Sequence, residues 1–84
     1  MSAAKIEKFA RMANQIGDYY AAMPPEQAGA GVATHIRKFW TPKMIQETLA
    51  ALAQQKLTLN ETASRGFAIL RTDFGVATSA VSRA

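Results

Sequence analysis

The sequence contains no cysteine and only one histidine, His35, among its 84 residues. Without cysteine, the chain cannot form a disulfide, hold an iron–sulfur cluster through thiolates or provide a cysteine nucleophile. One histidine is also too few for a zinc site, which takes four ligands. No two of the six carboxylates are spaced as a pair on one helix face, which acid–base catalysis by paired carboxylates would need. We therefore expect no catalytic, cofactor-binding or metal-binding residues in this chain.

Long hydrophobic runs are also absent. Residues 2–8 mix small, apolar and charged side chains, with no apolar segment of the length found in a signal peptide. No stretch reaches the roughly 20 apolar residues of a membrane-spanning helix. The sequence therefore predicts a cytoplasmic protein without a membrane anchor.

Large apolar side chains are scarce. Hydrophobic residues make up 49% of the chain, but 17 of those 41 residues are alanine. A chain of this length forms one domain, and a single small core leaves little net stability. We expect a single helical domain over residues 1–84, with a shallow core that completes its burial against another protein.

Three segments have apolar residues at alternating steps of three and four, which is the spacing of one face of an α-helix. The expected helices cover residues 4–22, 25–39 and 42–56. Pro24 and Pro25 separate the first two, and Pro42 suits the first turn of the third, after a possible cap at Thr41. The pattern predicts an all-α bundle with a three-helix core in residues 1–57. The side chains expected to form its shared core are Phe9, Ile16, Ile36, Phe39, Leu49 and Leu52.

An amphipathic C-terminal segment, residues 58–84, follows this core. Asn60 can cap a fourth helix over residues 60–77, beyond which the end is expected to fray. Its apolar residues follow a heptad seam: Ala63, Phe67, Leu70, Phe74, Ala77 and Val81. Gly66 and Gly75 each cost about 1 kcal/mol relative to alanine. This helix therefore needs a surface to pack on, and one candidate is the same seam in a second copy.

The turn between the second and third expected helices has the most unusual composition. Phe39 continues the apolar stripe and is expected in the core, whereas Trp40 lies where the helix ends and is expected to be partly exposed. The indole is either a core plug or an anchor for a partner. Tyr19 points about 100° away from Tyr20 of the stripe, so it is a candidate contact residue. The full set of candidate partner-binding residues is Trp40, Arg37, Lys38, Tyr19, His35 and Asn14.

The chain is basic, with a net charge of +4 and a pI near 9.9. The cations form two short strips, Lys5, Lys8 and Arg11, and Arg37, Lys38 and Lys43. A small basic helical domain can bind nucleic acid through phosphate contacts, as helix-turn-helix proteins do. However, the third expected helix carries no arginine that could read a guanine edge. Solubilising charge, or contact with an acidic protein surface, is therefore favoured over nucleic-acid binding as the role of these strips.

Two motifs lie on either side of the first proline break. Residues 11–16 read Arg-Met-Ala-Asn-Gln-Ile, and residues 35–44 read His-Ile-Arg-Lys-Phe-Trp-Thr-Pro-Lys-Met. Together they resemble the delta subunit of NAD-dependent formate dehydrogenases, over about residues 5–56. The resemblance implies a non-catalytic subunit of a cytoplasmic complex. In such a complex, the alpha subunit carries a molybdenum or tungsten bis-pterin cofactor and iron–sulfur clusters and oxidises formate, while other subunits carry FMN and reduce NAD⁺.

Three functions remain open at this point. The first is an accessory subunit that docks on the alpha subunit and stabilises the formate dehydrogenase complex or helps to assemble it. The second is a small basic nucleic-acid-binding domain, and the third is a free-standing helical homo-oligomer. The lack of cysteine, the small size and the shallow core all agree with the first.

Overall fold

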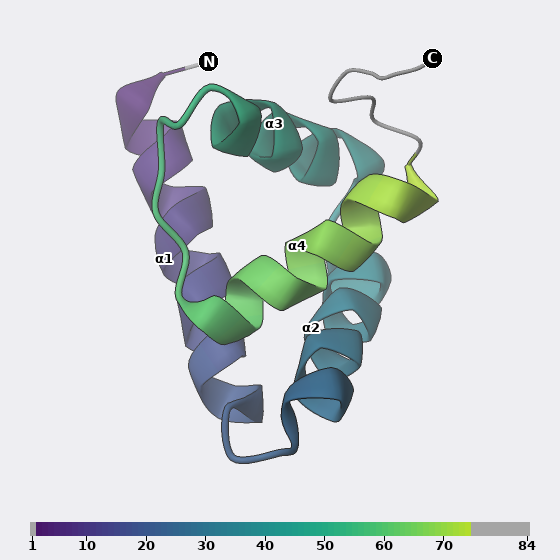
Figure 1. Cartoon of the computed structure of the whole chain (residues 1–84). Helices are drawn as coiled ribbons and strands as arrows, with labels where there is room; N and C mark the ends of the chain where they lie inside the picture. The colour runs from purple at the N-terminus through teal and green to yellow at the C-terminus, as the bar shows by residue number, and fades with distance from the viewer. Residues whose placement is uncertain (1, 75–84) are drawn as a thin grey trace.

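The computed structural model describes residues 2–74, which form four α-helices and no strand (Figure 1). The helices are α1 (Ala3–Tyr20), α2 (Pro25–Phe39), α3 (Pro42–Ala53) and α4 (Glu61–Asp73). The predicted all-α fold is confirmed, and so are the boundaries at the two proline turns. The last three residues of the expected fourth helix, 75–77, lie outside the described part of the chain.

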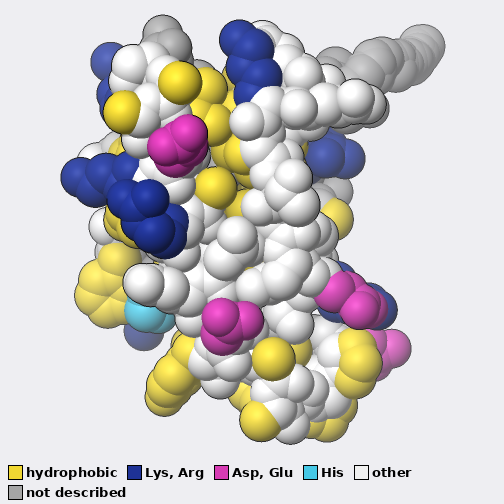
Figure 2. All heavy atoms as spheres, turned by 90° about the vertical axis from the view of Figure 1, so that its left-hand side faces the viewer, with side chains coloured by type: hydrophobic (Ala, Val, Ile, Leu, Met, Phe, Trp, Pro, Cys, Tyr) yellow, Lys and Arg dark blue, Asp and Glu magenta, His cyan; other side chains and the backbone are white. Residues whose placement is uncertain are grey.

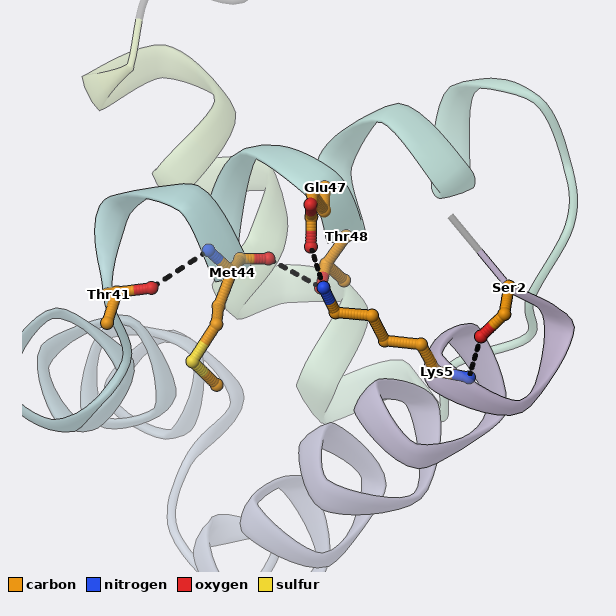
Figure 3. A network of polar contacts seen from close by, with 6 residues as sticks. All are labelled: Ser2, Lys5, Thr41, Met44, Glu47 and Thr48. Carbon is orange, nitrogen blue, oxygen red and sulfur yellow. Dashed lines mark hydrogen bonds and ion pairs between the residues drawn. The ribbon is translucent and has the colours of Figure 1, made fainter.

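Polar side chains cap three of the helices, and the caps of α3 and α4 are those that the sequence predicted. Ser2 Oγ accepts a hydrogen bond from the Lys5 backbone N–H at 3.2 Å, which caps α1. Thr41 Oγ1 accepts from Met44 N–H at 3.1 Å at the start of α3 (Figure 3). Asn60 Oδ1 accepts from Ala63 N–H at 2.8 Å at the start of α4. Each bond satisfies an amide that has no partner within its own helix.

The end of α3 differs from the prediction, because the helix stops at Ala53 rather than at residue 56. Gln55 adopts a left-handed conformation, with φ at 58°. The Lys56 N–H then donates to Ala51 O at 2.9 Å, and the Gln55 N–H donates to Leu52 O at 3.0 Å. This pair of bonds is a Schellman ending, which usually has glycine at the left-handed position. The sequence has no glycine there, so its apolar pattern did not reveal where the helix ends.

The variant Gln55→Gly should therefore stabilise the protein. A side chain in the left-handed region costs about 1–2 kcal/mol in steric repulsion, whereas glycine adopts it freely. Glycine also makes the unfolded chain more flexible, so we expect a net gain of about 0.5–1 kcal/mol in the free energy of unfolding. Urea denaturation would measure it, with Gln54→Gly, at a right-handed position next to it, as the control that should lose stability. A loss of stability in both variants would contradict this account of the helix end.

The helices enclose one core. α1 and α2 run in opposite directions and are joined by the proline turn, α3 lies beside the start of α1, and α4 crosses between α1 and α2 (Figure 1). α4 packs mainly on α2 and secondarily on α1. The core therefore depends on the fourth helix, which the sequence had placed outside a three-helix core.

Glycine permits the close packing of α4 on α2. A Cβ atom added at Gly66 would lie 2.7 Å from Val32 Cβ and 3.4 Å from the Ala33 backbone N. A Cβ added at Gly29 would lie 2.9 Å from Arg65 Cβ. Gly29 and Gly66 thus permit the close approach of the two helices.

Three of the six side chains that were predicted to form the shared core are buried. Phe9, Ile36 and Leu49 are buried, while Ile16 and Leu52 are half-buried against the same cluster. The prediction for Phe39 is wrong, because its side chain is 70% exposed. The other side chains buried in the cluster are Ala13, Val32, Ala33, Trp40, Ile45, Ala63, Phe67 and Leu70.

Candidate functional site

Trp40 is a core residue. Its side chain is only 6% exposed, and its ring centroid lies 5.7 Å from that of Phe9 and 5.8 Å from that of Phe67. The expectation that Trp40 would be partly exposed is therefore wrong. The reason lies in the backbone: α2 ends at Phe39, and Trp40 is extended, with φ at −98° and ψ at 147°. Because the backbone changes direction here, the indole of Trp40 occupies the buried position that the periodicity had assigned to Phe39.

Asn14 connects α1 to the segment that precedes α4. Its side chain donates to Thr58 O at 3.2 Å and accepts from the Asn60 N–H at 2.7 Å. The Asn60 side chain donates back to Asn14 O at 3.0 Å and to Asp18 Oδ1 at 3.2 Å. Asn14, proposed from the sequence as a contact residue, is thus occupied within the chain, where it positions the cap of α4.

Ion pairs remove one cation from each basic strip. Lys5 Nζ lies 3.3 Å from Glu47 Oε1, which joins α1 to α3 (Figure 3). Arg37 pairs with Asp73 and joins α2 to the end of α4. Lys38 is exposed and forms no ion pair with the residues that the structure describes. Of the two cations proposed for the turn, Lys38 is therefore the one available to a partner.

Four aromatic side chains form a row along α1 and α2. Ring centroids are 5.0 Å apart for Tyr19 and Tyr20, 6.4 Å for Tyr20 and His35, and 4.8 Å for His35 and Phe39. We call these four residues the aromatic row. Tyr19 is 81% exposed and Phe39 is 70% exposed, while the two middle residues are half-buried. Figure 2 shows hydrophobic side chains beside the single histidine.

The aromatic row partly matches the candidate residues. Tyr19 and His35 were proposed from the sequence and lie in it, whereas Trp40 and Asn14 do not. Phe39 was missed because its position in the apolar stripe suggested burial. The sequence did hold one signal for it, since His35 and Phe39 are four residues apart and so meet on the surface of a helix.

This fold conflicts with the pairing of two copies of the chain through the predicted heptad seam. Ala63, Phe67 and Leu70 are buried inside the chain, where they pack against α1 and α2. Phe74 is half-buried, and Ala77 and Val81 lie outside the described residues. The described part of the seam is therefore already used in the core of one molecule.

Two further features of the described residues bear on function. Between residues 2 and 74, no three His, Asp or Glu side chains gather as a metal site requires. No helix in the same range combines the length and the apolar character needed to cross a bilayer.

The chain matches a model of a known protein family. The family model described as NADH-dependent formate dehydrogenase delta subunit FdsD matches residues 8–66. The match runs from the first turns of α1 into the middle of α4, and so includes the aromatic row and most of the core. No curated protein and no solved structure matches the chain.

Proposed function

Since the chain belongs to the family of NADH-dependent formate dehydrogenase delta subunits, we propose that it is a non-catalytic accessory subunit. In this proposal it docks on the catalytic alpha subunit and stabilises the formate dehydrogenase complex or helps to assemble it. The observation that carries the proposal is the family match over residues 8–66.

The chemistry of the chain supports a role without catalysis. It has no cysteine for iron–sulfur ligation and one histidine, which stacks on Phe39 in the aromatic row. We propose that the molybdenum or tungsten bis-pterin, the iron–sulfur clusters and FMN belong to other subunits of the complex. The oxidation of formate and the reduction of NAD⁺ would then take place there, in the cytoplasm.

The exposed surface supports a role in binding. Two large aromatic side chains, Tyr19 and Phe39, lie in water in a domain with a small core. Aromatic residues dominate the energetics of protein interfaces, because they bury a large area with few rotatable bonds. A subunit that needs a partner surface to complete its burial would have such a face.

Co-purification from the native host would test the proposed function. A tagged full-length chain should recover the formate dehydrogenase subunits, and deletion of its gene should lower the yield of active complex. The purified chain alone should contain no stoichiometric iron, molybdenum or flavin and should not oxidise formate. A tagged chain that recovers no subunit of the complex, or that reduces NAD⁺ with formate on its own, would contradict the proposal.

A further inference from the structure

The aromatic row lies on the side of the α1–α2 pair that α4 does not cover. On α1, α4 packs at Gly17, where an added Cβ would lie 2.9 Å from the Ala63 backbone N. Tyr19 is two residues further on and therefore about 200° away around the helix axis. On α2, Ala33 faces α4 and His35 is again two residues further on. Tyr19 and His35 thus point away from α4, and the two ends of the row, Tyr19 and Phe39, are exposed.

Cations flank the Phe39 end of the row. Lys38 is the chain neighbour of Phe39 and follows His35 by three residues on the α2 surface. Lys8 precedes Phe9 on α1, and the ring of Phe9 lies 5.7 Å from that of Trp40, the residue that follows Phe39. Both lysines are exposed and make no ion pair with the residues that the structure describes. On the face of the molecule drawn in Figure 2, Lys and Arg side chains lie near hydrophobic ones.

We propose that the aromatic row, with Lys8 and Lys38, docks an acidic protein surface of another subunit of the complex. This inference rests on the proposed function and adds to it the surface and the chemistry of the partner. Phe39 and Tyr19 would each enter an apolar recess, and carboxylates around the recess of Phe39 would pair with the two lysines.

Charge distinguishes this partner from a second copy of the chain. In a two-fold dimer, the same patch lies on both sides of the interface. The lysines around Phe39 would then face the lysines of the other molecule, and like charges brought together across an interface oppose binding. The net charge of +4 adds to this repulsion. A carboxylate-bearing partner turns the same charges into an attraction that also speeds association.

Stacking holds the aromatic row in place before binding. The ring centroids of His35 and Phe39 are 4.8 Å apart. Those of Tyr20 and Tyr19 are 5.0 Å apart, with the two rings edge to face. Side chains that are already ordered lose little conformational entropy when a partner binds, so more of their burial contributes to affinity. The row therefore has the properties of an interface hot spot, with aromatic anchors at its centre and charges at its rim.

Binding of the full-length chain to the other subunits of its own complex would test the proposal. Phe39→Ala and Lys38→Glu should each weaken this binding by about tenfold or more, which is typical for the loss of an interface anchor. The melting temperature of each isolated variant should stay near that of the wild type. Lys56→Glu, at an exposed lysine beyond the end of α3, is the charge control and should bind as the wild type does.

The outcomes separate this proposal from the proposed function. If the wild type recovers the other subunits and both variants bind equally well, the docking surface is wrong and the accessory role stands. If the wild type recovers none, both proposals are overturned. The isolated chain could instead dimerise or bind phosphatidylserine vesicles through the aromatic row. If Phe39→Ala abolished either of these interactions, the proposal of an acidic protein partner would be overturned.

Discussion

Trp40→Ala is expected to cause a large loss of stability. The indole is 6% exposed and is the contact between Phe9 of α1 and Phe67 of α4. Truncation of a buried Trp to Ala typically costs about 3–5 kcal/mol, through lost transfer free energy and the cavity that remains. A chain of this length has a total stability of about 4–13 kcal/mol. The loss should therefore lower the melting temperature by at least about 12 °C.

Phe39→Ala is the matched control, because it removes an aromatic ring from the neighbouring residue. Phe39 is 70% exposed, so we expect its loss to change stability by less than about 0.5 kcal/mol. The sequence pattern had placed Phe39 in the core, where the same truncation would cost about 3–5 kcal/mol. Thermal unfolding of both variants, followed by far-ultraviolet circular dichroism, would measure the difference. Equal melting temperatures, or a larger loss in Phe39→Ala, would contradict the assignment of Trp40 to the core.

Gly66→Ala should destabilise the protein, although helix propensity predicts the opposite. In an exposed helix, alanine is favoured over glycine by about 1 kcal/mol. Here the added methyl group would lie 2.7 Å from Val32 Cβ, close to the α2 backbone. A β-branched side chain in a helix has almost one rotamer, so Val32 cannot turn aside and α4 must move away from α2. Overpacking of this kind costs about 1–3 kcal/mol, which leaves an expected net loss of up to about 2 kcal/mol after the gain in helix propensity.

Ala68→Gly is the control for this prediction, since Ala68 is an exposed residue two positions further along α4. Its change to glycine should cost about 1 kcal/mol by propensity alone. Both variants should therefore lose stability in urea denaturation, even though one removes a glycine and the other creates one. A gain in stability for Gly66→Ala would show that α4 does not need the close approach to α2.

The sequence predicted much of the local structure and less of which side chains are buried. Tyr19 and His35, proposed as contact residues, both lie in the aromatic row, whereas the burial of Phe39 and Trp40 was interchanged. The interchange arises where the helix ends. The apolar stripe assigned burial to Phe39, but the backbone becomes extended at Trp40 and the indole is buried instead. The sequence pattern also missed the end of α3 at Ala53. The left-handed position after it is taken by Gln55 rather than by glycine, so no glycine marks the helix end.

By itself, the sequence determined those features of this protein that depend on neighbouring residues. Proline positions, polar caps and the 3.6-residue period act over one or two helical turns, so the four helices and the all-α class could be read directly. Only the tertiary structure decided which side chains share the core. That choice depends on where α4 crosses α1 and α2, at Gly17, Gly29 and Gly66, and these contacts join residues 30 or more positions apart. Because α4 covers one side of the α1–α2 pair, the aromatic row remains exposed on the other, and no local pattern contains that information.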